Sequence, residues 1–132
     1  MGPLISVIII TYNQAWCLRE TILSVLDQTY PRMEIIVVDD ASTDGIDRIV
    51  TSFGSRVKLI RNVRRTGQAA INRNIGTRAA SGEYIAFLDG DDLWDPEKLA
   101  VQIRGARQYP TLGLIAVDGI QFRHEDGTIL SF

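Results

Sequence analysis

Short continuous apolar runs alternate along the chain with stretches in which apolar residues recur every three or four positions. The continuous runs are strand-sized and rich in β-branched residues, as in strands that are buried on both faces. They cover residues 4–10, 34–38, 57–60, 84–88 and 112–117. The pattern therefore predicts five strands of a largely parallel sheet.

The stretches between these runs have the apolar spacing of helices. They cover residues 15–28, 43–53, 67–80 and 96–109. Ser42 or Thr43 is expected to cap the second helix, and Asp95 and Pro96 to cap and begin the fourth. Repeated β–α units with short connections predict an α/β fold in a single domain of 132 residues.

The last part of the chain has the pattern of a hairpin. Asp126 and Gly127 are a favourable two-residue turn. They lie between residues 120–123 and 128–132, which we expect to pair as antiparallel strands.

Polar and acidic residues follow three of the predicted strands. They are residues 11–13 (TYN), 39–40 (DD) and 89–92 (DGDD). Ligands of parallel sheets bind beyond the carboxyl ends of the strands, so these segments are expected to meet. Crowded carboxylates repel one another unless a cation compensates them, and Mg²⁺ or Mn²⁺ binds carboxylates together with substrate phosphates. The sequence predicts a metal–diphosphate site; the alternative is a solvated acidic loop that caps the next helix.

The net charge of −2 implies no polyanion partner, but the charges are unevenly distributed. No acidic residue lies between Asp47 and Glu83, a stretch that carries seven arginines and one lysine. Acidic clusters flank this stretch on both sides. Since arginine pairs with phosphate, the arrangement also suits a diphosphate ligand, unless the blocks of charge are only a solvated surface.

Several other classes of protein are excluded or disfavoured. The first strand is followed by TYNQAW, without the glycine pattern of dinucleotide-binding folds, and no P-loop is found. FLDGDD resembles the motif of haloacid dehalogenase phosphatases, but Asp92 stands where that motif has glycine. No apolar run is long enough to span a membrane, and no signal peptide is evident. Cys17 and His124 are single, so neither a disulfide framework nor a Cys/His zinc site is expected, and both are interpreted as structural or incidental.

Four segments, taken in order, resemble a known family. They are SVIIITYNQ, SVLDQTYP, EIIVVDDASTDG and RNIGTRAASGEYIAFLDGDDLWDPEKL. Together they are similar to the N-terminal nucleotide-binding part of family 2 glycosyltransferases, over about residues 4–130. The resemblance implies the GT-A fold, a Rossmann-like α/β/α sandwich that binds a nucleoside-diphosphate sugar, most commonly a UDP-sugar.

The resemblance also implies roles for residues of the nucleoside pocket. Thr11 and Tyr12 match residues that line this pocket, although Tyr12 has the alternative of packing under a helix. Asp40 matches the acid that accepts the ring N–H of the base, while Asp39 is expected to hold the loop. Arg73 matches a residue near the base and the diphosphate.

Asp89 and Asp91 match the D-x-D motif of the family. The resemblance implies that Asp89 contacts ribose, and that Asp91, with Asp92 beside it, binds Mn²⁺ or Mg²⁺. Trp94 is interpreted as a packing residue, and Asn72 and Asn74 as residues that fix the turn around Arg73.

The implied activity is inverting transfer of a sugar to a hydroxyl of a glycan or lipid-linked acceptor, in polysaccharide or cell-envelope synthesis. The family's general base and acceptor region lie well after the D-x-D motif, so we expect them beyond Phe132, and Glu125-Asp126 is not assigned to that role. The 132 residues are thus expected to be a truncated donor half with little or no transfer activity. The alternative is a non-catalytic binding module, conceivably a homodimer.

Two further expectations complete the sequence-based description. The protein is expected to be cytoplasmic, or peripheral at the inner face of the membrane, with no nucleic-acid partner. Arg65-Thr66-Gly67 stands where many relatives have Asn-x-Gly, so the contact with the base or phosphate is expected to differ there.

Overall fold

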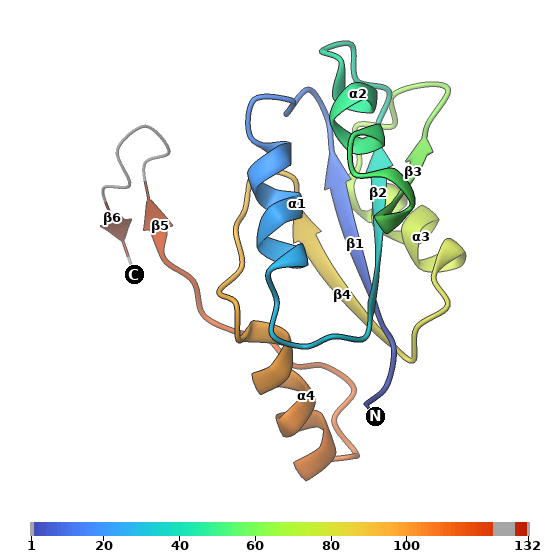
Figure 1. Ribbon diagram of the computed structural model, residues 1–132. Helices are drawn as coiled ribbons and strands as arrows, with labels where there is room; N and C mark the ends of the chain where they lie inside the picture. Colours follow the sequence, from blue (N-terminus) through green and yellow to red (C-terminus); the bar gives the residue numbers. More distant parts are fainter. Residues whose placement is uncertain (1, 123–128, 132) are drawn as a thin grey trace. The chain divides into compact units, whose positions relative to one another are not determined.

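The computed structural model describes residues 2–122 and 129–131, which form two compact units, Met1–Ala100 and Val101–Phe132. The first unit contains a four-stranded sheet. Its strands are β1 (Ile5–Thr11), β2 (Met33–Asp39), β3 (Val57–Arg61) and β4 (Tyr84–Asp89). They are all parallel and lie in the order β3-β2-β1-β4 (Figure 1). The four strands predicted for this part of the chain are confirmed.

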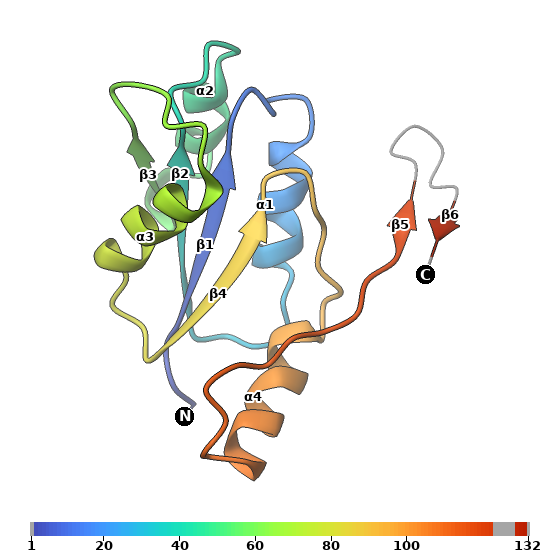
Figure 2. The same cartoon turned by 180° about the vertical axis from the view of Figure 1, so that it is seen from behind.

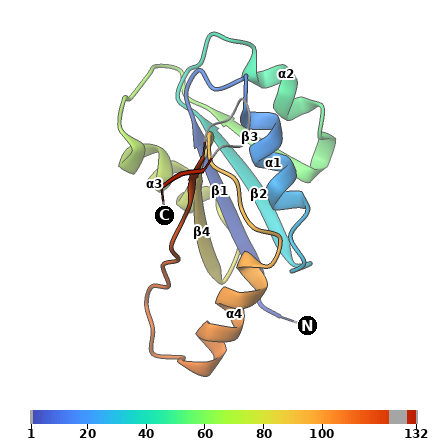
Figure 3. The same cartoon turned by 90° about the vertical axis from the view of Figure 1, so that its left-hand side faces the viewer.

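The centre of the sheet is buried on both faces, as its continuous apolar pattern predicts. Val7, Ile8 and Ile9 of β1 have no exposed surface, and neither do Ile36 and Val37 of β2. Helices cover both faces (Figures 2 and 3): α1 (Leu18–Leu26) and α2 (Ile46–Thr51) lie on one side, and α3 (Ala69–Ala79) lies on the other. The first unit is therefore an α/β/α sandwich.

The order in which strands are added to the sheet reverses after β3. From β1 the chain proceeds to β2 and β3, and α3 then returns it to the other side of β1, where β4 pairs. Gly76 permits the close approach of α3, because a Cβ atom there would lie 2.4 Å from Cγ2 of Ile8. The reversal leaves a crevice at the carboxyl ends of β1 and β4, where ligands of such sheets bind.

The second helix is shorter than predicted. It begins at Ile46, and the preceding Gly45 has a φ of +85°, so neither Ser42 nor Thr43 caps it. The Ser42 hydroxyl instead donates to the carboxylate of Asp39, at the end of β2. The predicted cap is wrong because α2 begins four residues after Ser42, and the Ser42 hydroxyl oxygen accepts from the backbone N–H of Asn13 at 2.9 Å instead of from the helix. A 3₁₀ turn, η1 (Gly54–Arg56), follows α2.

The second unit corrects one strand prediction. Residues 112–117 form no strand in the described structure, and Leu114 is 84% exposed. An apolar run makes a strand only when a neighbour supplies hydrogen-bond partners, and no described strand pairs with this one. α4 (Lys98–Gln108) crosses the boundary between the units and starts two residues later than predicted.

The expected hairpin pairing is confirmed. β5 (Gln121–Phe122) and β6 (Ile129–Ser131) are antiparallel. Asp126 and Gly127, the predicted turn, lie outside the described residues. None of the described helices has the length and apolar character needed to cross a membrane.

Candidate functional site

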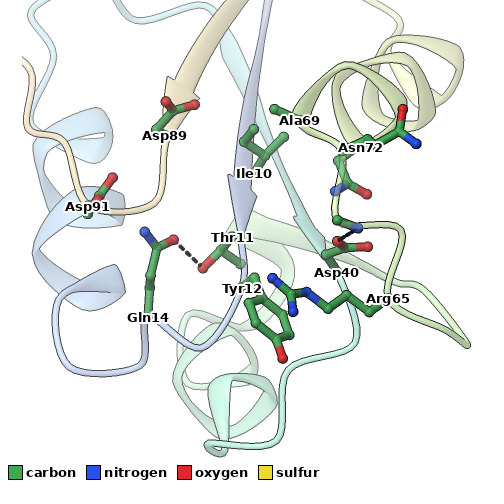
Figure 4. Close-up of a pocket in the computed structure, with 12 residues that line it drawn as sticks. Ile10, Thr11, Tyr12, Gln14, Asp40, Arg65, Ala69, Asn72, Asp89 and Asp91 are labelled. Carbon is green, nitrogen blue, oxygen red and sulfur yellow. Dashed lines mark hydrogen bonds between the residues drawn. The ribbon is translucent and has the colours of Figure 1, made fainter.

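A pocket of about 310 Å³ lies at the carboxyl ends of the parallel strands, within the Met1–Ala100 unit (Figure 4). The end of β1, the loops after β1, β2, β3 and β4, and the start of α3 supply its walls. The lining residues are Ile10, Thr11, Tyr12, Gln14, Asp40, Arg65, Gly67, Gln68, Ala69, Asn72, Asp89 and Asp91. The structure therefore brings together five of the predicted site residues: Thr11, Tyr12, Asp40, Asp89 and Asp91.

The end of β4 is held tightly against the end of β1. Gly90 N donates to the carbonyl of Ile10 at 2.9 Å, and its own carbonyl accepts from the Thr21 hydroxyl at 2.9 Å. A Cβ atom on Gly90 would lie 2.9 Å from Cβ of Thr11. The glycine between Asp89 and Asp91 thus lets the acidic loop approach the first strand.

Asp40 anchors the loop that leads into α3. Its buried carboxylate accepts hydrogen bonds from Asn62 Nδ2 at 2.9 Å and from the backbone N–H groups of Thr66 and Gly67, both at 2.8 Å. Burial alone raises the pKa of Asp40, but these hydrogen bonds outweigh it and lower the pKa to about 2. Asp40 is therefore an ionised acceptor at the wall of the pocket.

Asn72 connects the same loop to α3. It is 4% exposed, and its side chain accepts from Asn62 at 2.7 Å and donates to the Thr66 hydroxyl at 3.2 Å. It lines the pocket and fixes the loop at the same time.

Asp39 faces away from this network. It accepts from the backbone N–H of Ser42 at 3.0 Å, and its Oδ2 lies 3.4 Å from Nε of Arg61. It is fully buried and is not among the residues that line the pocket. Asp39 holds the loop after β2, whereas Asp40 faces the pocket.

Tyr12 and Arg65 form a stacked pair at one end of the pocket. The Arg65 guanidinium lies over the Tyr12 ring, 3.9 Å from the ring centre (Figure 4). Both residues line the pocket. The stacked pair gives this end an aromatic surface and a positive charge.

The acidic residues lie at the other end. Asp89 and Asp91 line the pocket on the far side of β1 from Asp40 and Arg65 (Figure 4). Nη2 of Arg73, on α3, lies 2.9 Å from Oδ1 of Asp89, and Arg73 itself is not a lining residue. Arg73 thus acts on the pocket through Asp89.

Asp92 is exposed beside Asp91 and does not line the pocket. Partial burial, followed by the negative charges of Asp91 and Asp89, raises its pKa. No three His, Cys, Asp or Glu side chains converge on a metal position among the described residues. The donor set nevertheless fits Mg²⁺ or Mn²⁺, because such ions are commonly held by one or two carboxylates together with substrate phosphates.

Seven of the twelve lining residues were not predicted as site residues, and Gln14 and Arg65 are among them. Gln14, from TYNQ, accepts a hydrogen bond from the Thr11 hydroxyl at 3.0 Å and lines the acidic end. For Arg65, the sequence predicts only that the contact with the base or phosphate differs from that of many relatives. The place of Arg65 in the basic stretch, just before a helix that leads to the site, was the available signal.

This parallel sheet, with helices on both faces and an acid-lined pocket at its carboxyl edge, defines the GT-A class of nucleotide-sugar-dependent transferases. Residues 6–126 match the family described as "Glycosyl transferase family 2". The chain belongs to this family.

Relatives and solved structures agree with this assignment. The chain is 44% identical over 101 residues to the UDP-Glc:alpha-D-GlcNAc-diphosphoundecaprenol beta-1,3-glucosyltransferase WfgD of Escherichia coli; the match covers 76% of this chain and 40% of WfgD. The S. aureus TarS 1–349 complex with UDP-GlcNAc has a TM-score of 0.77 and 26% identity, covering 92% of this chain and 38% of TarS.

A second solved structure is the mannosyltransferase PcManGT from Pyrobaculum calidifontis in complex with GDP-Man and Mn²⁺. It has a TM-score of 0.73 and 30% identity, and the match covers 96% of this chain and 37% of that one. The match covers between 17% and 41% of the length of the curated relatives, so the chain spans less than half of each of them.

Proposed function

We propose that this chain supplies the donor site of an inverting glycosyltransferase and binds the nucleoside diphosphate part of a UDP-sugar. The observation that carries the proposal is the two-ended pocket, in which Tyr12 and Asp40 lie at one end and Asp89 and Asp91 at the other. A nucleoside diphosphate has a flat base, which suits the aromatic end, and an anionic diphosphate, which a divalent cation would link to the carboxylates of the acidic end. UDP-GlcNAc in the TarS complex and GDP-Man with Mn²⁺ in PcManGT support this class of ligand.

At the base end, Tyr12 offers an aromatic edge and Asp40 a carboxylate oxygen for a ring N–H. The low pKa of Asp40 keeps it an acceptor at any physiological pH. Thr11 shapes the floor of the pocket between the two ends, because it packs against Gly90 and donates to Gln14.

At the acidic end, Asp89 is proposed to accept from ribose hydroxyls, with its orientation fixed by the ion pair to Arg73. Asp91, with Asp92 beside it, would hold Mn²⁺ or Mg²⁺. Such an ion supplies Lewis-acid stabilisation of the negative charge on a departing diphosphate. Without a cation, the crowding of Asp89, Asp91 and Asp92 is unfavourable. The charges of Asp91 and Asp89 add to the effect of partial burial, which is the larger cause of the raised pKa of Asp92.

Transfer further requires a general base that deprotonates the acceptor hydroxyl. We assign no residue of the 132 to this role. The acceptor is proposed to be a glycan or a lipid-linked sugar, as printed in the name of WfgD, in polysaccharide or cell-envelope synthesis. A cytoplasmic or inner-membrane-associated site of action is part of the same proposal, and a homodimer is its proposed alternative assembly.

The experiment is calorimetric titration of the 132-residue chain with UDP, GDP and dTDP, each with and without Mn²⁺. We expect UDP to bind, and Mn²⁺ to strengthen binding at least about tenfold, which corresponds to about 1.4 kcal/mol. If none of the nucleotides binds under either condition, the proposed donor site is wrong. If binding does not depend on Mn²⁺ or Mg²⁺, the metal part of the proposal is wrong and the nucleotide part stands.

A further inference from the structure

Arg65 is placed in the pocket with its hydrogen-bond donors unused. Its guanidinium carbon lies over the Tyr12 ring, 3.9 Å from the ring centre, and no hydrogen bond or ion pair engages it within residues 2–122 and 129–131. A guanidinium carries five N–H donors in its own plane. Because Arg65 lines the pocket and its guanidinium lies against the Tyr12 ring, these donors are available to a ligand in the pocket.

Asp40 supplies the complementary acceptor. Its two oxygens have about four lone-pair positions, and the loop uses three of them. The backbone N–H of Thr66, the residue after Arg65, is one of these three donors. Because the loop is tied to Asp40 at this point, Arg65 emerges from a fixed backbone, and the pocket presents an acceptor and a donor at the same end.

Such a pair matches only some nucleobases. Uracil carries a ring N–H next to a carbonyl oxygen, and so does guanine. Cytosine and adenine have the reverse arrangement, an unprotonated ring nitrogen next to an amino group. With these two bases, a lone pair would face the carboxylate and an amino group would face the guanidinium.

We infer that Arg65 is a specificity-determining residue, which donates to the base carbonyl adjacent to the N–H that Asp40 accepts and thereby selects uracil and guanine over cytosine and adenine. The inference rests on the proposed function, since it requires a nucleotide in this pocket. The inference goes beyond the proposed function because it assigns the discrimination between bases to Arg65, which stands where many relatives have the asparagine of Asn-x-Gly.

A phosphate-binding role for Arg65 is the main competing explanation, because arginine pairs well with phosphate. The geometry favours the base. Arg65 is stacked on Tyr12 at the end of the pocket opposite Asp89 and Asp91, where the diphosphate is expected. The two roles also differ in their consequences, since a phosphate contact would affect all nucleoside diphosphates equally.

The test compares UDP with CDP, which differ only at the edge of the base that Arg65 and Asp40 are proposed to read. The 132-residue chain, Arg65→Met and Arg65→Lys are titrated with both nucleotides in the presence of Mn²⁺. Arg64→Met is the matched control, because it removes the same charge from the neighbouring exposed position, which does not line the pocket. Circular dichroism melting checks that each variant is folded; Arg65 is exposed, so no loss of folding is expected.

We expect the wild-type chain to prefer UDP over CDP by at least tenfold. Arg65→Met should lower this ratio about tenfold by weakening UDP alone, Arg65→Lys should give an intermediate ratio, and Arg64→Met should leave it unchanged. An Arg65→Met variant that weakens UDP and CDP equally, or neither, overturns the inference and leaves the proposed function intact. Absence of any nucleotide binding by the wild-type chain overturns both.

Discussion

Nη2 of Arg73 lies 2.9 Å from Oδ1 of Asp89, which joins the middle of α3 to the last residue of β4. The two side chains are 36% and 47% exposed, so the pair stabilises the fold only slightly. The ion pair instead fixes the direction of the Asp89 carboxylate in the pocket. Its effect on ligand binding can therefore be measured separately from its effect on the free energy of unfolding.

Arg73→Met should change the free energy of unfolding by less than about 1 kcal/mol, because exposed ion pairs contribute little. It should nevertheless weaken UDP binding by about tenfold, since Asp89 loses its partner. Urea unfolding and calorimetry measure the two effects, and Arg78→Met on the exposed side of the same helix is the control. Equal UDP affinity of wild type and Arg73→Met would mean that Asp89 needs no positioning.

Asp91→Asn should abolish the strengthening of UDP binding by Mn²⁺ and leave the fold intact, because Asp91 is exposed at the pocket wall. The amide keeps the shape of the side chain but removes the charge that a hard cation requires. Titration of UDP with and without Mn²⁺ measures the change. Asp27→Asn, at the exposed end of α1, is the control. An unchanged response to Mn²⁺ would move the metal site elsewhere.

The stability of the chain should depend on pH through Asp40. Its pKa is lowered from 3.8 to about 2 by folding, so the folded state binds fewer protons than the unfolded state between these values. The contribution, about 2 kcal/mol, is present above about pH 4 and is lost as the pH falls towards 2.

Asp40→Asn should remove this contribution, so that the difference in unfolding free energy from wild type is large at pH 7 and shrinks near pH 2. Urea unfolding over this range measures it. A difference that stays constant with pH would show that the charge of Asp40 is not stabilised by the loop.

Gly90→Ala should destabilise the chain by about 1–3 kcal/mol, because the added methyl group would lie 2.9 Å from Cβ of Thr11, on a central strand. UDP binding should weaken as well, since the acidic loop would be displaced from β1. Gly113→Ala is the matched control, because nothing lies within 4 Å of its added methyl group. Similar thermal midpoints for the two variants would contradict the close packing of the D-G-D-D segment.

Cys17 should be unreactive in the folded chain. Its thiol is buried, and burial together with the charges of Asp91, Glu20 and Asp44 raises its pKa to about 11. At pH 8 the thiolate fraction is lowered about 100-fold from that of an ordinary cysteine. Reaction with a chromogenic disulfide reagent should be slow in buffer and fast in guanidinium chloride. Rapid reaction of the folded chain would disprove the burial of this thiol.

The apolar pattern predicted the four-stranded sheet because the runs of its two central strands, β1 and β2, are buried on both faces. The outer strands β3 and β4 are only partly buried, but their apolar runs are still long enough to be recognised. The same pattern failed for residues 112–117, since an apolar run does not reveal whether a partner strand exists. The predicted cap of α2 failed for a similar reason, because the Ser42 hydroxyl oxygen accepts from the backbone N–H of Asn13, a residue that only the folded chain brings beside it.

The part of the candidate site that lies at the ends of strands could be predicted from the sequence. Tyr12, Asp40, Asp89 and Asp91 each follow or end a strand, and parallel topology brings them to one edge. The loop network around Asp40 was not predictable, because its partners Asn62, Thr66 and Gly67 have ordinary loop composition. The stacking of Arg65 on Tyr12 joins two loops, and periodicity carries no information about such a contact.

The two ends of the pocket depend on strand pairings that differ in sequence separation. Tyr12 and Asp40 follow β1 and β2, which are neighbours along the chain, whereas Asp89 reaches the pocket only through pairing of β4 with β1, about 80 residues apart. Closing so long a loop is slow and entropically costly, and β4 is the outermost strand on its side of the four-stranded sheet. We therefore expect the base end to form first in folding and the acidic end last. Release of β4 would remove the acids while the base end persisted, so the divalent-ion affinity proposed for the acidic end would report on completion of the sheet.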